Sequence, residues 1–329
     1  MSDTLIDGAA ERLERRTSPT TSIRKDLSVS FEFFPPATPA GFETLEASAQ
    51  QLAPFSPSFV SVTYGAGGCS QEKTFAALDM LAANESLDVA GHLTCVAADK
   101  RSVDAVIDGY LDRGVNRIVA LRGDAPADAE GCSEDGRHPN GYCDAAELVA
   151  AIRSRPDADE IDVSVAAYPE VHPKAESPAS DMDNLKRKID AGADRALTQF
   201  FFDTDVFLRF LENARAAGIT APIVPGIMPV TNFAGICRFS ERCGTKVPQW
   251  MHDLFADLDD VPEVRELVAA TVAAEQCKQL MDHGVRDFHF YTMNKPNLIA
   301  ATCRILGLTP KATANAAPKA SADSQTKAS

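Results

Sequence analysis

The sequence predicts an α/β protein built as a single (β/α)8 TIM barrel, with extra helices before the last strand. Eight short runs rich in Val, Ile and Phe recur along the chain, most of them at intervals of roughly 30 residues with helical patterns between them. The alternative, a doubly wound open sheet that binds a dinucleotide, is disfavoured because no GxGxxG or GxxxxGK[ST] motif follows any run. The nearest glycine cluster, GAGG at residues 65–68, has the spacing of neither phosphate-binding loop.

The eight runs are the expected strands. In chain order they span residues 28–34, 59–65, 89–96, 116–123, 162–169, 195–202, 222–229 and 286–293. Apolar residues three and four apart predict helices that end near Gly114 and Gly218. A further helix is expected to begin with Ser180 and Asp183, which have the spacing of a capping box. Two connections, residues 124–142 and about 230–285, exceed the repeat, and the second is long enough for the extra helices.

Both ends of the chain are polar and are expected to lie outside the barrel. Residues 1–27 form an N-terminal polar extension, and residues 28–308 form the barrel. Residues 309–329 contain Ala, Ser, Thr, Lys and Pro but no large apolar side chain. Such a tail cannot bury enough surface to fold, so we expect it to be disordered.

The composition narrows the classes of function. The 329 residues include 47 acidic and 32 basic side chains, a formal charge of -15 that repels nucleic acid and anionic membranes. No apolar run approaches the roughly 20 residues of a membrane span, and the first 25 residues lack a signal-peptide core. The 8 cysteines show no CxxC pair and no zinc-site spacing. We therefore expect a cytoplasmic protein with free thiols and no metal.

Polar side chains gather at the ends of the expected strands, where a (β/α)8 barrel carries its catalytic residues. Seven of the eight strands end with a hydrogen-bonding or ionisable group: Glu32, Thr63, His92, Arg122 with Asp124, Tyr168, Gln199, and His289 with Tyr291. Packing alone does not explain this pattern, so the sequence predicts an enzyme with its active site at this end.

Glu32 is the strongest single candidate for a catalytic residue. Strand alternation places Val29, Phe31 and Phe33 on one face and Ser30 and Glu32 on the other. If the apolar face packs against the helices, Glu32 points into the barrel, where desolvation would raise its pKa and suit it to general acid catalysis near neutral pH. The alternative is a structural ion pair with a neighbouring arginine.

The remaining candidates are weaker when taken alone. Asp124 and Arg122 flank Gly123, which lets the backbone approach a ligand closely, although the two charges could instead neutralise each other. His92 and His289 each stand alone on a strand without a carboxylate at ligand spacing, so hydrogen-bonded core residues are a more common explanation than metal ligands.

Four cations could form a basic pocket in this acidic protein. Arg187 and Lys188 lie on the helix that follows the fifth expected strand, and Arg122, at the end of the fourth, and His172 lie at the same end of the barrel. Such a pocket would bind a small anion. The alternative is that Arg187 and Lys188 form a solvated helix face.

Eight segments in register resemble the bacterial type of 5,10-methylenetetrahydrofolate reductase: SFEFFPP, FVSVTYGA, HLTC, ALRGD, SVAAYPEVHP, NLKRKIDAGADRALTQFFFD, GIMPVTNF and DFHFYTMN. They follow one another through residues 28–308. The resemblance implies a (β/α)8 flavoprotein with tightly bound FAD. In such an enzyme NADH or NADPH passes a hydride through FAD to 5,10-methylenetetrahydrofolate by a ping-pong reaction. The product, 5-methyltetrahydrofolate, supplies methyl groups for methionine biosynthesis. The resemblance also implies a homo-oligomer, with a tetramer as one form.

The resemblance also assigns roles to residues of this chain. Glu32 would donate a proton to the folate and Asp124 would act electrostatically beside the flavin and the pterin. Thr63 would contact nicotinamide, Gln199 would contact both substrates, and Phe239 would stack on either one. The positions implied for FAD are Ala66, His92, Arg122, Gly123, Asp124, Cys143, Tyr168, His172, Ala175, Asp181, Asn184, Arg187 and Lys188.

Two positions depart from the family pattern at the place where it holds the folate. Gly235 replaces a glutamine, and Lys295 replaces an arginine, so Lys295 can pair with a folate carboxylate only as a point charge. These changes motivate two alternatives: a flavin- or folate-binding barrel without catalysis, and a reductase of another imine-like acceptor. Retention of Glu32, Asp124 and Gln199 favours the folate reductase, because a binding protein needs no proton donor.

Overall fold

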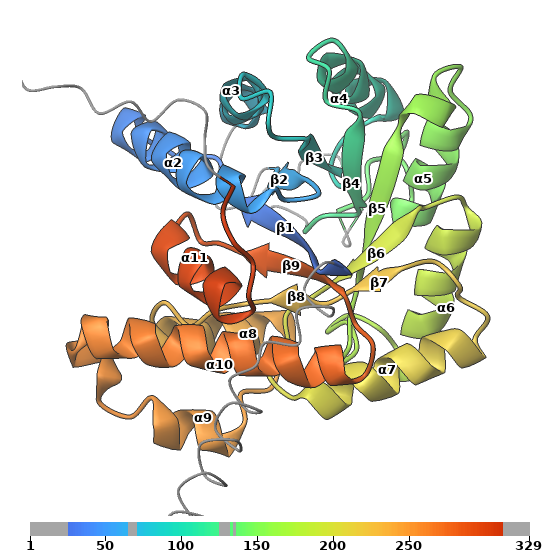
Figure 1. Ribbon diagram of the computed structural model, residues 1–329. Helices are drawn as coiled ribbons and strands as arrows, with labels where there is room; N and C mark the ends of the chain where they lie inside the picture. Colours follow the sequence, from blue (N-terminus) through green and yellow to red (C-terminus); the bar gives the residue numbers. More distant parts are fainter. Residues whose placement is uncertain (1–25, 65–70, 125–131, 134–135, 312–329) are drawn as a thin grey trace, which may run out of the picture.

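The computed structural model describes residues 26–64, 71–124, 132–133 and 136–311. Its described part is a nearly closed barrel of parallel strands surrounded by helices (Figure 1), which confirms the predicted fold class. The expectations for the 1–25 segment, for the 312–329 tail and for Ala66 lie outside the described residues.

The strands follow the predicted order, with one difference. They are β1 (Ser28–Phe33), β2 (Val60–Val62), β3 (Val89–Thr94), β4 (Arg117–Leu121), β5 (Asp162–Ala167), β6 (Arg195–Thr198), β7 (Ile223–Val224), β8 (Gly226–Ile227) and β9 (Asp287–Tyr291). Within the described residues they form one nine-stranded sheet in the order β7-β6-β5-β4-β3-β2-β1-β9-β8.

The seventh expected strand is divided into β7 and β8 at Pro225. Proline has no N–H group and cannot continue a ladder, but the carbonyl of Pro225 accepts a 3.0 Å hydrogen bond from the amide of His289. β7 pairs with β6, while β8 pairs with β9. The division therefore lets one segment bridge both edges of the sheet and bring the barrel close to closure.

The helices lie outside the strands, as predicted. They are α2 (Pro39–Leu52), α3 (Gln71–Ala82), α4 (Lys100–Leu111), α5 (Ala145–Arg153), α6 (Pro178–Asp190), α7 (Thr204–Ala216), α8 (Phe233–Cys243), α9 (Gln249–Leu254), α10 (Pro262–Asp282) and α11 (Pro296–Ile305). The extra helices expected before the last strand are present in the stretch from α8 to α10 (Figure 1).

Helix α6 begins earlier than predicted. Its N-cap is Ser177, whose hydroxyl accepts from the amide of Ser180 while the hydroxyl of Ser180 accepts from the amide of Ser177. The capping box is therefore Ser177 with Ser180, and the expected pair Ser180 with Asp183 is wrong. Pro178, at the first helical position, explains the earlier start because its fixed φ suits that position.

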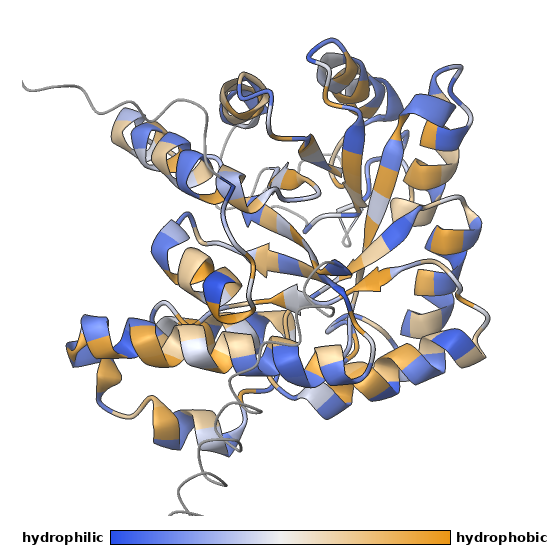
Figure 2. Ribbon diagram, viewed as in Figure 1, coloured by the Kyte–Doolittle hydropathy of each residue, from blue (hydrophilic) through white to orange (hydrophobic). Residues whose placement is uncertain are grey.

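Strand alternation divides the buried residues into two layers. Side chains such as Val29, Phe31 and Phe33 belong to the large cluster between sheet and helices, which Figure 2 shows as hydrophobic strand and helix surfaces. A smaller cluster fills the lower lumen with Phe59, Ala90, Val119, Leu197 and Val224. The prediction that Glu32 faces the lumen, opposite Phe31 and Phe33, is confirmed by its contacts with His92 and His289.

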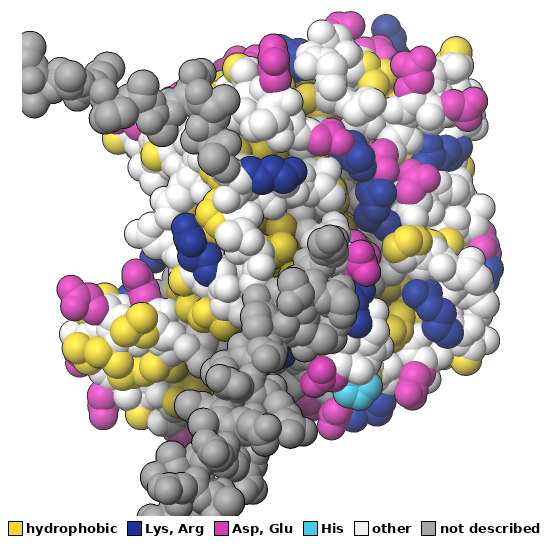
Figure 3. Space-filling view, in the orientation of Figure 1, with side chains coloured by type: hydrophobic (Ala, Val, Ile, Leu, Met, Phe, Trp, Pro, Cys, Tyr) yellow, Lys and Arg dark blue, Asp and Glu magenta, His cyan; other side chains and the backbone are white. Residues whose placement is uncertain are grey.

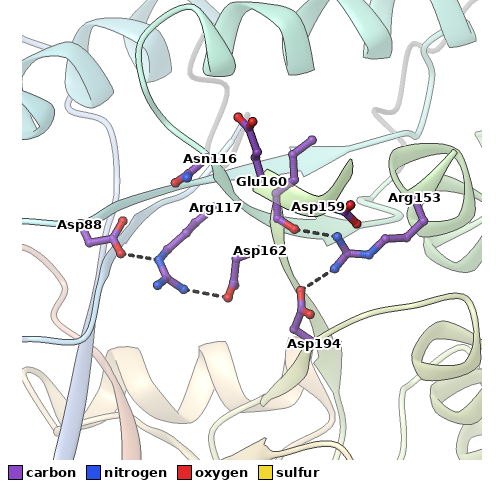
Figure 4. Close-up of a pocket in the computed structure, with 9 residues that line it drawn as sticks. Asp88, Asn116, Arg117, Arg153, Asp159, Glu160, Asp162 and Asp194 are labelled. Atoms are coloured by element: carbon purple, nitrogen blue, oxygen red, sulfur yellow. Dashed lines mark hydrogen bonds and ion pairs between the residues drawn. The ribbon is translucent and has the colours of Figure 1, made fainter. Parts of the chain in front are cut away.

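Ion pairs close the amino-terminal end of the barrel. Arg117 lies between Asp88, at 2.6 Å, and Asp162, at 2.9 Å (Figure 4). Arg195 also pairs with Asp162. The cavity at this end has a volume of about 490 Å³ and is lined almost wholly by charged and polar residues. Ion pairs at this end of a (β/α)8 barrel contribute to stability, because the chemistry lies at the opposite end.

Hydrophobic side chains are exposed on the added helices. α10 carries Val264 and Leu267, which are 45% and 72% exposed, and Figure 3 shows hydrophobic atoms gathered at the left end of this helix. Among the described residues, no helix has both the length and the apolar character that crossing a membrane requires.

Candidate active site

The polar residues predicted at the strand ends meet at the carboxyl-terminal mouth of the barrel. Thr63 directly follows β2, Gln199 follows β6, and Tyr168 follows β5, while His92 lies within β3. Because every strand pairing in the described part is parallel, their carboxyl ends share one rim of the sheet. The sequence prediction of a polar mouth is thereby confirmed in its arrangement.

Glu32 lies between two imidazoles at the centre of this mouth. Its Oε2 is 3.2 Å from His92 Nε2 and 3.3 Å from His289 Nε2. The other nitrogen of the His289 ring, Nδ1, is 2.7 Å from Ser30 Oγ. His289 is fully buried and stacks 5.7 Å from Phe59, so its ring orientation is fixed from several sides. The arginine partner considered for Glu32 is absent among the described residues, and histidines take its place.

The expected rise of the Glu32 pKa is wrong in this structure. Burial raises the pKa, but the attraction and hydrogen bonding of His92 and His289 outweigh burial and lower it from 4.5 to about 2. Glu32 is therefore a carboxylate at neutral pH. A proton that Glu32 donates must first reach it, and the adjoining imidazole nitrogens are the nearest groups able to carry one.

A second buried contact fixes the wall beside Glu32. The hydroxyl of Tyr291 donates to the carbonyl of Thr198 over 2.7 Å, and the hydroxyl of Thr198 accepts from the amide of Gly226 over 2.9 Å. A Cβ at position 226 would lie 2.2 Å from Thr198 O and 2.6 Å from Tyr291 Cε2. Glycine at 226 is thus required for β6, β8 and β9 to approach closely at the mouth.

An aromatic surface borders the same mouth. Phe239, on α8, is 38% exposed and stacks on buried Phe200 with ring centroids 5.5 Å apart. Phe200 also lies 6.4 Å from Tyr291, ring to ring. A planar ring system could stack against the exposed face of Phe239.

Three of the four residues predicted to form a basic pocket, Lys188, Arg187 and His172, lie on or beside α6. Lys188 is buried and donates from Nζ to the carbonyl of Ala166 over 2.5 Å. Burial lowers the pKa of Lys188 to about 8, against the opposing effect of Asp181 and Asp144. Burial likewise lowers the pKa of His172, whose ring lies edge-on to Tyr168 at 4.5 Å. A buried lysine with one carbonyl partner has donors left for an anion.

Arg187 and Asp124 are more exposed than Lys188. Arg187 donates to Asp144 Oδ2 and to Asn184 Oδ1, each over 2.9 Å, so it is held in place rather than free in solvent. Asp124 pairs with Lys174 at 3.5 Å, and its side chain is 94% exposed. Neutralisation of Asp124 by Arg122, the alternative considered from sequence, is not among the ion pairs of the described residues.

The residues present fit a flavin cofactor. Thr63 Oγ1, a buried polar atom at the mouth, has no hydrogen-bond partner among the described residues, and His92 Nε2 has only its contact of 3.2 Å with the Glu32 carboxylate. Buried groups of this kind need a partner, and a flavin ring offers carbonyl and N–H groups. The cations near Lys188 suit the phosphates of such a cofactor. Cys143, which precedes the N-cap residue of α5, donates its backbone amide to Glu147.

The structure shows the surroundings of Gly235 and Lys295, the two positions that depart from the family pattern. The amide of Gly235 donates to Asn232 Oδ1, the N-cap of α8, over 2.6 Å, and a Cβ at 235 would lie 2.9 Å from that oxygen. Lys295 is the N-cap residue of α11 and lines a cleft of about 180 Å³ with Thr231 and Glu266.

Sequence reasoning missed several residues that shape the site. Ser30 was placed on the lumen face without a role, and Thr292, Asn294 and Thr198 were not singled out, yet all four hold the site through hydrogen bonds. The signal for Thr292 and Asn294 was a Thr-x-Asn spacing directly after a strand, which is typical of side chains that bond to backbone. No cluster of metal-ligating residues occurs in the described ranges.

Comparison with known proteins gives a consistent result. A family model described as methylenetetrahydrofolate reductase matches residues 17–307. A 5,10-methylenetetrahydrofolate reductase of Pectobacterium carotovorum is 42% identical over 301 residues, which cover 92% of this chain and 97% of that protein. The enzyme of that name from Escherichia coli K12 is 42% identical over 288 residues, covering 88% and 93% respectively.

Two further proteins extend the comparison. An Arabidopsis thaliana protein named methylenetetrahydrofolate reductase (NADH) 1 is 35% identical over 85% of this chain, which corresponds to 48% of that longer protein. A solved Clostridium thermocellum protein, described as binding two copies of 5-methyl-5,6,7,8-tetrahydrofolic acid, matches with a TM-score of 0.56. It is 12% identical and covers 87% of this chain and 96% of its own, so it supports the fold alone.

Proposed function

The chain belongs to the methylenetetrahydrofolate reductase family, and on this premise we propose how its mouth carries out the reaction. The enzyme reduces 5,10-methylenetetrahydrofolate to 5-methyltetrahydrofolate. We infer that FAD is the tightly bound cofactor, that NADH is the reductant, and that Glu32 is the proton donor to the folate. The arrangement that carries this proposal is the Glu32 carboxylate held between His92 and His289 at the mouth.

The proton path proposed here follows the contacts of Glu32. Opening the five-membered ring of the folate requires a proton on a ring nitrogen as the reactive iminium forms. An imidazolium at His289 can pass its proton over 3.3 Å to Glu32 Oε2, while Ser30 at 2.7 Å steadies the other nitrogen of the ring. Folate bound over the mouth excludes water, which favours the protonated carboxyl at the moment of transfer.

The residues proposed to hold FAD lie around the mouth and the α6 side. Lys188, Arg187 and His172 would contact the phosphates, and Asn184 and Asp181 on α6 fix Arg187 and the backbone of His172. The remaining proposed FAD contacts are Ala66, His92, Arg122, Gly123, Asp124, Cys143, Tyr168 and Ala175. When bound, FAD supplies hydride transfer from NADH to the methylene carbon of the folate.

The folate and the nicotinamide are proposed to use the same surface in turn, which gives a ping-pong reaction. Phe239 would stack on either ring system, Gln199 would contact both, and Thr63 would contact the nicotinamide. Asp124 would stabilise positive charge on the bound substrate. Lys295, beside the cleft at the start of α11, would pair with a folate carboxylate.

We further infer a cytoplasmic role in supplying methyl groups for methionine biosynthesis, and a homo-oligomer. All cysteines in the described ranges are free thiols, which is typical of a reducing compartment. NADH rather than NADPH is supported by the name of the Arabidopsis relative.

The test of Glu32 is a Glu32→Gln variant followed in separate half-reactions. We expect NADH to reduce the flavin at nearly the wild-type rate, and the folate to reoxidise it at least about a hundredfold more slowly, because general acid catalysis contributes about 10² to 10⁴. Glu85→Gln, at an exposed glutamate, is the matched control and should change neither step. Equal reoxidation in Glu32→Gln and wild type would overturn the role of Glu32.

A second candidate function rests on Gly235 and Lys295. A reductase of another imine-like acceptor would show flavin reduction by NADH but no reoxidation by methylenetetrahydrofolate in the wild-type protein. A binding protein without catalysis would show neither step. Both outcomes are separate from the result expected of the folate reductase.

A further inference from the structure

The turn that follows β9 is tied to the end of β1 by side chains. Thr292 donates from Oγ1 to the carbonyl of Glu32 over 2.7 Å, and its amide donates to the same carbonyl over 3.1 Å. Asn294 donates from Nδ2 to the carbonyl of Phe34 over 3.0 Å and accepts from the amide of Phe34 over 3.2 Å. The ladder between β1 and β9 ends at Glu32 and Tyr291, so these side chains extend the pairing beyond the strands.

The turn has a strained backbone that hydrogen bonds hold in place. Met293 and Asn294 both have a φ of 52°, in the left-handed region that asparagine tolerates and methionine does not favour. The amide of Asn294 donates to Thr292 Oγ1 over 3.1 Å, and Ser48 donates to the carbonyl of Asn294 over 3.2 Å. Thr292 and Asn294 are 1% and 8% exposed. The hydrogen bonds therefore hold a backbone that would otherwise relax.

Asn294 accepts from the last backbone N–H group before two successive prolines at this end of β1. The residues after Phe34 are Pro35 and Pro36, which have no N–H group to donate. Two residues before Phe34 lies Glu32, whose carboxylate must stay within 3.3 Å of His289. On the other side of the turn, Lys295 directly follows Asn294 in the chain and donates its amide to the carbonyl of Thr292 over 2.9 Å.

We propose that Asn294 is a positioning residue that fixes the end of β1 carrying Glu32 and the turn carrying Lys295 as one rigid unit. The proton donor and the cation for the folate carboxylate then keep a constant separation, although they lie at opposite ends of the barrel sequence. This inference rests on the proposed role of Glu32 as proton donor. Asn294 touches neither substrate in this scheme and acts through the backbone of Phe34.

The experiment compares Asn294→Gly with wild type in the holoenzyme. Glycine keeps the left-handed backbone and removes only the carboxamide. We expect NADH to reduce the flavin within about twofold of the wild-type rate. Reoxidation by methylenetetrahydrofolate should slow about ten- to a hundredfold in its limiting rate, because a small displacement of a catalytic group has effects of this size. The control is Ser56→Gly, which also replaces a left-handed residue (φ 53°) but lies away from the mouth, and it should leave both rates unchanged.

Two further measurements separate positioning from general damage. Asn294→Gly should increase deuterium exchange in a peptide covering residues 31–36, because the Phe34 amide loses its acceptor, while Ser56→Gly should not. In a Glu32→Gln background, Asn294→Gly should change the limiting rate of reoxidation less than twofold, because Asn294 acts through Glu32. Equal slowing of both half-reactions, unchanged exchange, or full additivity with Glu32→Gln would each overturn the inference. If wild-type flavin is not reoxidised by the folate, the proposed function itself fails, which is a distinct result.

Discussion

Lys188 is held in an environment that costs stability, and its replacement by methionine measures that cost. The side chain is 6% exposed, and burial lowers the pKa from 10.5 to about 8. Since one pKa unit corresponds to about 1.4 kcal/mol, keeping this ammonium charged at neutral pH costs about 3 kcal/mol. Lys188→Met removes that cost but also removes the hydrogen bond to the carbonyl of Ala166, which is worth about 1–2 kcal/mol. We expect the apoprotein variant to be more stable than wild type at pH 7 by about 1–2 kcal/mol.

The dependence on pH gives the sign of this effect. Between pH 8 and 10.5 the unfolded chain binds a proton at Lys188 that the folded chain does not bind, so wild-type stability from this group rises with pH through that window. Below about pH 8 Lys188 is charged in both states, so the full free-energy cost of burying its charge is present. The advantage of Lys188→Met should therefore be largest at pH 7 and should shrink as the pH approaches 10.

The assay is urea unfolding of the apoprotein at pH 7 and pH 10, together with titration of FAD. Lys186→Met, on the same helix, is the matched control, because Lys186 pairs with Asp190 at the surface and should change stability by less than about 0.5 kcal/mol at either pH. FAD binding by Lys188→Met should weaken about thirty- to a hundredfold through loss of a charge-assisted bond to phosphate. A Lys188→Met apoprotein less stable than wild type at pH 7, or an advantage that does not change with pH, would refute this reasoning.

Three other substitutions test the fold around the mouth and at the base. Gly226→Ala should destabilise by about 1–3 kcal/mol in urea unfolding, since its Cβ would lie 2.6 Å from Tyr291 Cε2; wild-type stability would contradict the close approach. Gly123→Ala should weaken FAD binding measured by fluorescence, because Gly123 has a φ of 85° and its Cβ would meet Thr94 at 2.8 Å; unchanged binding would show that this backbone is not needed. Arg117→Met should lower stability by about 1 kcal/mol and leave both half-reactions unchanged, because it lies at the opposite end of the barrel with Asp162; a loss of turnover would connect the two ends.

The barrel and the composition of its mouth could be predicted because they depend on local patterns. Alternation within one strand is sufficient to place Glu32 opposite Phe31 and Phe33, and a strand of six residues leaves little freedom in that assignment. The positions of the predicted strand ends were sufficient to place Thr63, Gln199 and Tyr168 at the mouth of the barrel. These expectations needed no knowledge of which strands are neighbours.

The features that failed depend on contacts between distant parts of the chain. The pKa of Glu32 is lowered by His92 and His289 together, and His289 is 257 positions away and becomes a neighbour only when β9 pairs with β1. The sequence correctly predicted that desolvation raises the pKa of Glu32. It could not show that two histidines lower this pKa by more than desolvation raises it. The division of the seventh strand at Pro225 likewise involves a distant residue, because the carbonyl of Pro225 accepts a hydrogen bond from the amide of His289.

The start of α6 was predicted three residues too late because two nearby serines can each cap a helix. At the start of α6, Ser177 and Ser180 can each open a helix, and sequence spacing alone does not choose between them. Pro178 favours the earlier start because proline is accepted at the first helical position. Asn294 was overlooked for another reason, since its partners on Phe34 are 260 positions away.

The most direct test of the central claim is an anaerobic visible spectrum of the purified protein, recorded alone, after NADH and after methylenetetrahydrofolate. We expect a yellow protein that NADH bleaches and the folate recolours, which would establish the cofactor and both half-reactions together. A colourless protein that gains no colour with added FAD would contradict the flavin site around Lys188. Bleaching by NADH without recovery on adding the folate would contradict the role of the Glu32 mouth in folate reduction.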